Sequence, residues 1–464
     1  MKSIELAVVR SLDCDVLVCG GGCAGIGAAI AAARSGSRVI LAEADGYLGG
    51  AATAGLIGTF MTCLDVAGER QIIKGIYDEF ITEMQRDGGA IDWRECMGGN
   101  SYCGYRTRGH VGVVPYNIES FKRTAERMCV EAGVKLLYHA RLVAADIADP
   151  DGAADSTPVA VSTARRIARA YFSTKAGIYE SSAAEFIDAT GDAALAHEAG
   201  ATTFCGDENG DVQTSSMFFS IAGVDRAVLD SYMDTHTEMR ERFFMDEIER
   251  GQRSGEFPCG TQKLRIFENT DGRWYVNMAQ VDERIDTLDP EVVTAAEISQ
   301  REQIPKIVEF LRRHIPGLEN CYLVETAPAL GIRETRRIEG EYMLRGEDIM
   351  SGRRFDDGVV LCSNSVDMHK SVGVHYQPVT GQANYHIPLR SLIARGFENL
   401  GMAGRCLSAD RVALGAVRVM PPCFAMGEAI GITADMARRA SAPLSSVPAD
   451  RVRKAIVSRG GCVE

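Results

Sequence analysis

The feature that most constrains this chain is a glycine cluster near its N-terminus, Gly20-Gly21-Gly22-Cys23-Ala24-Gly25. A short apolar run, Val16 to Cys19, precedes the cluster, and apolar residues at helical spacing follow it as far as Gly36. A second apolar run, Val39 to Leu41, ends at the acidic residue Glu43. This order predicts a strand, a tight turn, a helix and a second strand, which is how a doubly wound nucleotide-binding fold begins.

The positions in this first turn have separate physical roles. Gly20 permits the tight turn off the strand, Gly22 leaves room for a pyrophosphate beside the backbone, and Gly25 allows the helix to pack closely on the sheet. The helix N-terminus offers free N–H groups and a partial positive charge to phosphates. Glu43 stands where an acid can accept hydrogen bonds from a ribose. The alternative is a glycine-rich loop in another doubly wound sheet, but the flanking strand, helix and acid favour a dinucleotide site.

A second glycine pair, Gly49-Gly50, follows the acid and leads to Thr53. Here the chain resembles the FAD-dependent oxidoreductases of the glutathione-reductase-like flavoprotein superfamily, in which a Gly-Gly-x-x-Thr segment runs along the pyrophosphate toward the flavin. The resemblance continues through Asp188–Asp192, Gly331–Arg337 and Tyr385–Arg438, and so extends over nearly the whole chain. It is specific for cofactor and fold, and unspecific for substrate.

The resemblance implies noncovalent FAD as the cofactor. It implies that the small-residue helix after Pro421-Pro422 directs its positive end at the flavin N1–C2 carbonyl. No second GxGxxG occurs, so a separate NADPH-binding domain is not expected. Together the motifs and the resemblance give the following cofactor-binding residues: Gly20, Gly22, Cys23, Ala24, Gly25, Glu43, Gly49, Gly50, Thr53, Gly191, Asp192, Gly404 and Arg405.

The expected fold class is α/β, with a Rossmann-like FAD-binding domain and an interleaved α+β substrate domain. The FAD-binding domain is predicted to have a central parallel sheet, with a third strand at Lys135–Tyr138, and an antiparallel β-meander over 142–186. The predicted boundaries are residues 1–86, 115–204 and 385–464 for the FAD-binding domain, and 87–114 and 205–384 for the substrate-binding domain.

Three segments of the predicted substrate domain have distinct patterns. Residues 225–252 predict one charged helix, and Pro290–His314 predict a long amphipathic helix. Residues 93–114 are rich in Gly, Cys and Tyr and predict a long loop, which is either a lid over a binding site or an ordered surface loop.

Flavin chemistry requires the protein to hold the substrate carbon near N5, to bind the polar groups of the substrate and to manage one proton. Arg333 and Arg336 are candidates to hold a carboxylate or polyol by bidentate hydrogen bonds. His369 is the candidate for proton transfer, with Asp367 on the same face if the segment is a strand. Structural roles are the alternative, since an acid such as Glu334 could pair with the arginines. The candidate catalytic residues are therefore His369, Arg333 and Arg336.

Composition limits the classes of partner. A net charge of −13 without a basic cluster argues against nucleic acid, and no apolar run is long enough to cross a bilayer. The N-terminus lacks the pattern of a secretory signal, so the expected location is the cytoplasm, where the 14 cysteines would stay reduced. No CxxC pair occurs, and no metal site is expected. The expected partner is a small-molecule substrate; the electron donor or acceptor and a homo-oligomeric state are left open.

These observations favour an FAD-dependent oxidoreductase, a dehydrogenase or reductase. It would transfer a hydride between flavin N5 and a small polar substrate such as a hydroxy acid, polyol or sugar derivative. Two alternatives stay open: a non-redox FAD- or NAD-binding protein of cofactor assembly, and an FAD subunit of an electron-transfer complex. Reduction of the bound flavin by a small molecule alone would favour the oxidoreductase.

Overall fold

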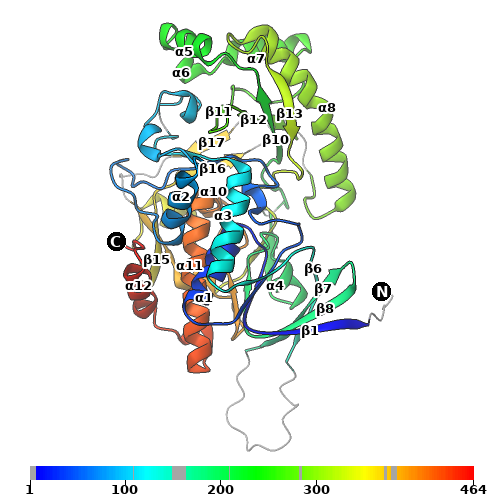
Figure 1. Ribbon diagram of the computed structural model, residues 1–464, viewed down its shortest axis with the longest axis vertical. Helices are drawn as coiled ribbons and strands as arrows, with labels where there is room; N and C mark the ends of the chain where they lie inside the picture. Colours follow the sequence, from blue (N-terminus) through cyan, green and yellow to red (C-terminus); the bar gives the residue numbers. More distant parts are fainter. Residues whose placement is uncertain are drawn as a thin grey trace, which may run out of the picture.

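The computed structural model describes residues 7–107, 109–148, 164–207, 209–281, 285–369, 374–377 and 384–464. Two larger sheets organise these residues, one seven-stranded and one four-stranded. The first sheet lies in the lower half of Figure 1, and the second lies at the top with its helices. The predicted fold class is confirmed, since a mixed central sheet with an antiparallel meander stands beside a separate antiparallel sheet.

The seven-stranded sheet has the order β5-β2-β1-β8-β7-β6, with a further strand, β19, on β8. Pairing is parallel among the nucleotide-binding strands and antiparallel in the meander β6-β7-β8. Both predictions are therefore confirmed, including the third parallel strand. The strands are β1 (Val8–Cys19), β2 (Val39–Ala42), β5 (Lys135–Leu137), β6 (Arg141–Ile147), β7 (Ile167–Thr174), β8 (Gly177–Asp188) and β19 (Leu400–Met402).

On the edge opposite β1, strand β8 has two different neighbours along its length. Residues 177–182 pair with β7, whereas residues 186–188 pair with β19 from the end of the chain. Beyond the meander, the buried run Val16–Cys19 of β1 is apolar without alternation, as expected for a parallel strand covered on both faces. The C-terminal segment thus completes the sheet at the point where the nucleotide-binding turns emerge.

Helices cover the parallel part of this sheet. The helix α1 (Cys23–Arg34) follows β1, and α11 (Met420–Ala440) packs along it, as Figure 1 shows in blue and orange. The prediction placed Pro421 and Pro422 just before the last long helix, but the helix begins at Met420 and holds both prolines in its first turn. Proline is accommodated there because the first N–H groups of a helix have no intrahelical acceptor. Nearby helices are α2 (Ile76–Arg86), α3 (Ile118–Glu131), α4 (Ala194–Glu198) and α12 (Ala449–Ser458).

The four-stranded antiparallel sheet has the order β11-β12-β10-β13. Its strands are β10 (Ser216–Ala222), β11 (Ile266–Glu268), β12 (Trp274–Gln280) and β13 (Tyr322–Thr326). The helix α8 (Pro290–His314) packs on it and has the predicted bounds. Asp289 caps its N-terminus through a carboxylate that accepts from the Glu291 and Val292 N–H groups, and proline occupies its first position.

The predicted single helix over 225–252 is wrong. The segment forms three helices, α5 (Arg226–Thr235), α6 (Met239–Arg242) and α7 (Met245–Ser254). Phe243 and Phe244 adopt left-handed backbone angles, with φ of 50° and 57°, and both side chains are buried. Burial of two consecutive aromatic side chains outweighs the helical preference of the charged residues around them.

Short strand pairs and helices connect the two larger sheets. The pair β16 (Val366–His369) and β17 (Val374–Gln377) lies beside the start of β10, because the Thr214 N–H donates to the His369 carbonyl. The remaining elements are β3 (Thr59–Phe60), β4 (Val114–Pro115), β9 (Thr203–Cys205), β14 (Arg336–Ile338), β15 (Gly358–Cys362), β18 (Tyr385–Pro388), α9 (Gly346–Met350) and α10 (Arg411–Val417). Among the described residues, no helix has the length and apolar character needed to span a bilayer. The domain boundaries stay a prediction.

Candidate functional site

Of three glycines in the first turn, Gly22 has open space where a side chain would lie, whereas Gly20 and Gly25 have none. A Cβ added at Gly22 would meet nothing within 4 Å, and the backbone there is extended, with φ −71°. Gly20 has φ +99°, a conformation that suits glycine, and a Cβ at Gly25 would lie 1.8 Å from the Gly20 carbonyl oxygen. The open space therefore lies at the helix N-terminus, where N–H groups can receive a phosphate.

Glu43 lies directly beside this turn. Its Oε2 accepts the Gly21 N–H at 2.6 Å and its Oε1 accepts the Asp45 N–H at 2.9 Å. Burial raises the pKa of Glu43, and these two donors oppose that rise. Each carboxylate oxygen keeps a second acceptor position, so hydrogen bonds from a ribose remain feasible.

The Gly49-Gly50 pair lies against the first turn. The Gly49 N–H donates to the Gly21 carbonyl at 2.8 Å, and the Gly50 backbone approaches Gly22 so closely that a Cβ there would lie 3.4 Å from its Cα. Thr53 is buried, and its hydroxyl donates to the Leu48 carbonyl at 2.9 Å. Thr53 therefore shapes the loop from within, while the glycines present backbone to the open space.

The second predicted turn is held by Arg405. Its Nε donates to the Gly191 carbonyl at 2.9 Å, and its Nη2 lies 2.5 Å from the Asp192 carboxylate. Thr335 donates to the same carboxylate at 2.9 Å. Next to Arg405, Gly404 has φ +86°, and a Cβ on it would lie 3.0 Å from the Ala24 Cβ. The structure thus brings the second turn and the C-terminal segment to the N-terminus of α1.

Two helix N-termini meet at this place. A Cβ added at Gly427 would lie 2.0 Å from the Ala24 carbonyl oxygen, and one added at Gly431 would lie 2.3 Å from that of Ala28. Four residues along α11 thus correspond to four residues in the same direction along α1. The two helices therefore run parallel, with their backbones almost in contact. Their positive ends therefore point toward the same region, which favours negative charge there.

His369 and Asp367 form a hydrogen-bonded pair on β16, as predicted from their spacing. The His369 Nε2 lies 3.1 Å from the Asp367 Oδ2. Burial, followed by the nearby Arg333, lowers the pKa of His369 to about 3, so its ring is neutral near pH 7. His369 and the cations Arg418 and Arg333 hold the pKa of the Asp367 carboxyl below its ordinary range against the effect of burial. An ionised Asp367 accepts from Nε2–H, which leaves the Nδ1 lone pair of His369 free of any partner among the described residues.

Arginine side chains surround this pair. Arg333 donates to the Thr214 carbonyl and, at 2.8 Å, to the Ser216 hydroxyl, and no carboxylate of the described residues is its hydrogen-bond partner. Burial and then Arg418 lower the pKa of Arg333 to about 9, which leaves it a cation at neutral pH. Arg418 lies 3.7 Å from the Asp367 carboxylate. Arg333 and His369 are thus brought together by the fold.

Arg336 lies elsewhere. Its guanidinium approaches the Asp192 carbonyl at 3.5 Å, so it belongs to the second turn and not to the group around His369. The structural alternative raised from the sequence applies to Arg337, which lies 3.9 Å from the fully buried carboxylate of Glu334.

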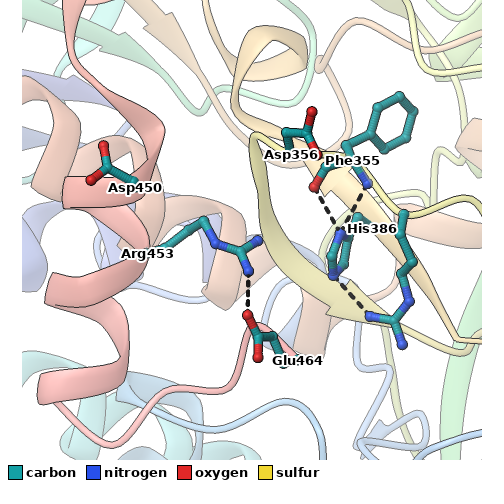
Figure 2. Close-up of a pocket in the computed structure, with 7 residues that line it drawn as sticks. Phe355, Asp356, His386, Asp450, Arg453 and Glu464 are labelled. Atoms are coloured by element: carbon teal, nitrogen blue, oxygen red, sulfur yellow. Dashed lines mark hydrogen bonds and ion pairs between the residues drawn. The ribbon is translucent and has the colours of Figure 1, made fainter.

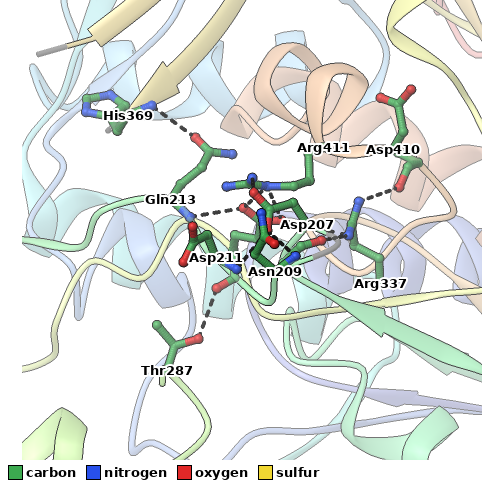
Figure 3. Close-up of polar contacts among 12 residues, drawn as sticks. Asp207, Asn209, Asp211, Gln213, Thr287, Arg337, His369, Asp410 and Arg411 are labelled. Carbon is green, nitrogen blue, oxygen red and sulfur yellow. Dashed lines mark hydrogen bonds and ion pairs between the residues drawn. The ribbon is translucent and has the colours of Figure 1, made fainter. Parts of the chain in front are cut away.

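Gln213 links the histidine to that buried carboxylate, and Figure 3 shows its contact with His369. Its Oε1 accepts the His369 N–H at 3.3 Å and an Arg418 N–H at 3.2 Å, while its own N–H donates to Glu334 at 3.0 Å. Glu334 is also held by Arg411 at 3.1 Å. This network fixes the backbone of the His369 strand against the segment that leads into β10.

Polar atoms without a partner gather at the same place. The side-chain Nε2 of Gln213, the Oγ of Ser215 and the Nε of Arg418 are buried, and none has a hydrogen-bond partner among the described residues. An unpaired buried polar group costs about 1–3 kcal/mol. Three such groups next to His369 favour a polar ligand bound here.

Two residues near His369 and Asp367 could not be identified from the sequence as part of the site. Gln213 and Arg265, a partly buried arginine that interacts electrostatically with Asp367, precede strands of the second sheet and stand in no recognisable motif. Only the fold of β10 and β11 brings them to the histidine. An isolated Gln or Arg at the start of a predicted strand carries no signal by itself.

A surface pocket of about 470 Å³ lies elsewhere, near the C-terminal end of the chain (Figure 2). His386 in its wall accepts the Phe355 N–H at 3.1 Å and donates to the Val463 carbonyl, 3.0 Å away. Arg453 pairs with Glu464 at 2.8 Å. His386, Arg453 and Glu464 in this pocket thus have partners within the protein, in contrast to the unpaired groups around His369.

Comparison with known proteins gives one family match. Residues 15–456 match the family described as FAD dependent oxidoreductase. Similar solved structures include a geranylgeranyl bacteriochlorophyll reductase-like protein from Thermoplasma acidophilum (12% identity, 97% of this chain and 84% of that chain, TM-score 0.46). Two others are p-nitrophenol 4-monooxygenase from Pseudomonas putida DLL-E4 (12%, 97% and 85%, 0.46) and a myxobacterial chondrochloren halogenase (11%, 97% and 79%, 0.47). None of the curated proteins matches the chain.

Proposed function

The chain belongs to the FAD dependent oxidoreductase family, and from that premise we propose that it transfers a hydride between flavin N5 and the hydroxyl-bearing carbon of a small hydroxy acid. The observation that carries this proposal is the neutral His369, with a free Nδ1, beside cationic Arg333 and Arg418. A carboxylate next to an alcohol or ketone matches that combination of cations and base.

The residues of the two turns fit FAD, the cofactor of the family. A Cβ at Gly22 would fill the space that a pyrophosphate needs, and no other atom of the described chain lies there. Gly20, Gly25, Gly49, Gly50 and Glu43 would surround the adenosine diphosphate part, and the N-terminus of α11 would face the flavin ring. When bound, FAD supplies a two-electron acceptor or donor at N5.

The protein residues then have three tasks. Arg333 and Arg418 bind the substrate carboxylate and orient the adjacent carbon. His369 takes the hydroxyl proton at Nδ1 when the alcohol is oxidised, or returns it when the ketone is reduced. Asp367 keeps the imidazole in the required tautomer and stabilises the imidazolium that forms.

Substrate binding strengthens His369 as a base. In the free site, burial and the neighbouring arginines lower its pKa to about 3, which disfavours proton uptake. A bound carboxylate compensates the positive charge of the arginines, so the pKa of His369 rises when the substrate is in place. The base therefore becomes effective only beside a correctly charged substrate.

The test is anaerobic mixing of the FAD-loaded protein with a panel of hydroxy acids, followed by flavin absorbance. His369→Gln should slow flavin reduction by about two to four orders of magnitude while FAD content is unchanged. Arg333→Lys should weaken substrate binding, turnover or both, because an ammonium lacks the planar fork. Arg301→Lys, on an exposed position of α8, is the matched control.

Two results would contradict the proposal. The first is a fully loaded His369→Gln protein with normal reduction kinetics. The second is equal reduction by a hydroxy acid and by its uncharged amide, since the arginines would then not recognise the carboxylate. If only polyols or neutral sugars reduced the flavin, the proposed hydroxy-acid substrate would be wrong, whereas the proposed hydride transfer would stand.

A further inference from the structure

The arginines around His369 continue beyond the residues that the proposed function uses. Arg265 comes directly before β11, and its carbonyl accepts the Asn277 N–H at 3.0 Å, so it extends the ladder between β11 and β12. The Asn277 side chain lies 3.1 Å from the Ser216 hydroxyl, which in turn accepts from Arg333. Arg265 and Arg333 are therefore joined through adjacent strands of the same sheet.

The Arg265 guanidinium has no hydrogen-bond partner among the described residues, and the residue is partly buried. Burial lowers its pKa, and the nearby Asp367 opposes that effect. Asp367 is the one carboxylate that acts on Arg265, Arg333 and Arg418 alike among the described residues. Three guanidinium groups share this one carboxylate, and Glu334 acts on Arg418 alone of the three, so positive charge is in excess around Arg265 and Arg333, an arrangement that favours anionic ligands.

Arg106 from the loop 93–114 and Lys263, which precedes β11, add positive charge near Arg265. The His110 ring stacks on Phe267 at 5.3 Å between centres, and Phe267 shares its strand face with Arg265, two residues before it. Arg106 contacts His110 at 3.3 Å. The Arg106 guanidinium and the Lys263 ammonium lie 5.2 Å and 5.7 Å from the centre of the Phe243 ring. Arg106 and Arg265 both act electrostatically on Lys263.

We propose that Arg265, with Arg106 and Lys263 beside it, forms a second anion-binding subsite, so that the substrate carries a second anionic group remote from its reacting carbon. This inference rests on the proposed function, in which Arg333 and Arg418 bind the first carboxylate. The substrate class is then a dianionic hydroxy acid, such as a hydroxydicarboxylate or a hydroxy acid with a phosphate group.

Anion binding can be measured without turnover. The probes are unreactive linear dicarboxylates from malonate to adipate, and monocarboxylates of the same chain lengths, titrated into the FAD-loaded protein at constant ionic strength. Perturbation of the flavin spectrum and calorimetry give the dissociation constants. Wild-type protein should bind the best-fitting dicarboxylate roughly tenfold to a hundredfold more tightly than the matched monocarboxylate.

Variants locate the second subsite. Arg265→Gln should remove the preference for two charges while monocarboxylate binding is retained, and Arg333→Lys should weaken the binding of both. Arg265→Lys keeps the charge and should keep part of the preference. Arg253→Gln, on the exposed surface of α7, is the control for the change in net charge. If Arg265→Gln does not fold, Arg106→Gln tests the same subsite, with a smaller expected loss.

The inference is overturned if wild-type protein binds dicarboxylates no better than monocarboxylates at every length. It is also overturned if Arg265→Gln weakens both classes equally, because Arg265 would then serve a single anion. Failure of the proposed function looks different: no hydroxy acid, mono- or dianionic, would reduce the flavin, whereas the preference for dicarboxylate probes would persist.

Discussion

At the scale of single residues, substitutions at Gly22 and Gly25 distinguish the requirements of cofactor binding from those of folding. Gly22→Val should give a folded protein that does not bind FAD, because the backbone there is allowed for any residue and the side chain would fill only the pyrophosphate space. Gly25→Ala should fail to fold, because its Cβ would lie 1.8 Å from the Gly20 carbonyl oxygen. FAD content and the thermal unfolding of both proteins test this pair.

The two variants serve as controls for each other. A Gly22→Val protein with full FAD content would place the pyrophosphate elsewhere. A stable Gly25→Ala protein would show that α1 and β1 are not in close contact at this turn.

At the scale of helices and strands, a buried carboxylate joins α11 to α2. The Glu428 Oε2 accepts the Ile76 N–H at 3.1 Å, while its Oε1 has no partner among the described residues. Burial raises its pKa to about 7, a rise that the Ile76 N–H, Arg459 and Arg34 oppose and Glu79 supports. Glu428 is therefore protonated in the folded protein at pH values where the unfolded chain has already lost this proton.

The sign of the pH effect follows from this difference. Between pH 4.5, the ordinary value, and about 7 the folded state binds more protons than the unfolded state, so stability falls as pH rises. Above pH 7 the loss is complete and amounts to about 3 kcal/mol, at roughly 1.4 kcal/mol per pKa unit. Glu428→Gln removes this loss, so it should stabilise the protein at pH 8 and change little at pH 5. Denaturant unfolding of both proteins at the two pH values measures it; a difference independent of pH would contradict the assignment.

The sequence predicted correctly those features that depend only on residues near one another in the chain. The bounds of α8 follow from the Asp289-Pro290 start and the apolar spacing, and the contact between His369 and Asp367 follows from the alternation of side chains along a strand. The break at Phe243-Phe244 was not predictable, since it depends on the apolar surface that buries the two rings. Arg265 was missed for the same reason: its place beside Arg333 is set by pairing between strands far apart in sequence.

At the scale of the whole molecule, the glycine turn near the N-terminus depends on a helix near the other end. α1 packs through Ala24 and Ala28 directly on the backbone of α11 at Gly427 and Gly431. A chain ended after residue 419 should therefore not bind FAD, although it keeps Gly20 to Gly25, Gly49-Gly50 and Gly191. A chain ended after residue 447 loses α12 but keeps α11, and should still bind FAD with lower stability. FAD content of the two purified proteins tests this, and cofactor binding by the shorter one would contradict it.

The parallel contact between α1 and α11 also sets the order of events during synthesis. Strand β8 of the first sheet ends at Asp188, and Met420 follows about 230 residues later, which at about 5–20 residues per second takes on the order of 10–50 s. Throughout that interval the small-residue face of α1 has no cover on the ribosome. The growing chain therefore presents apolar surface to chaperones for a time that is fixed by the position of α11 in the sequence, and no increase in the stability of the finished protein can shorten it.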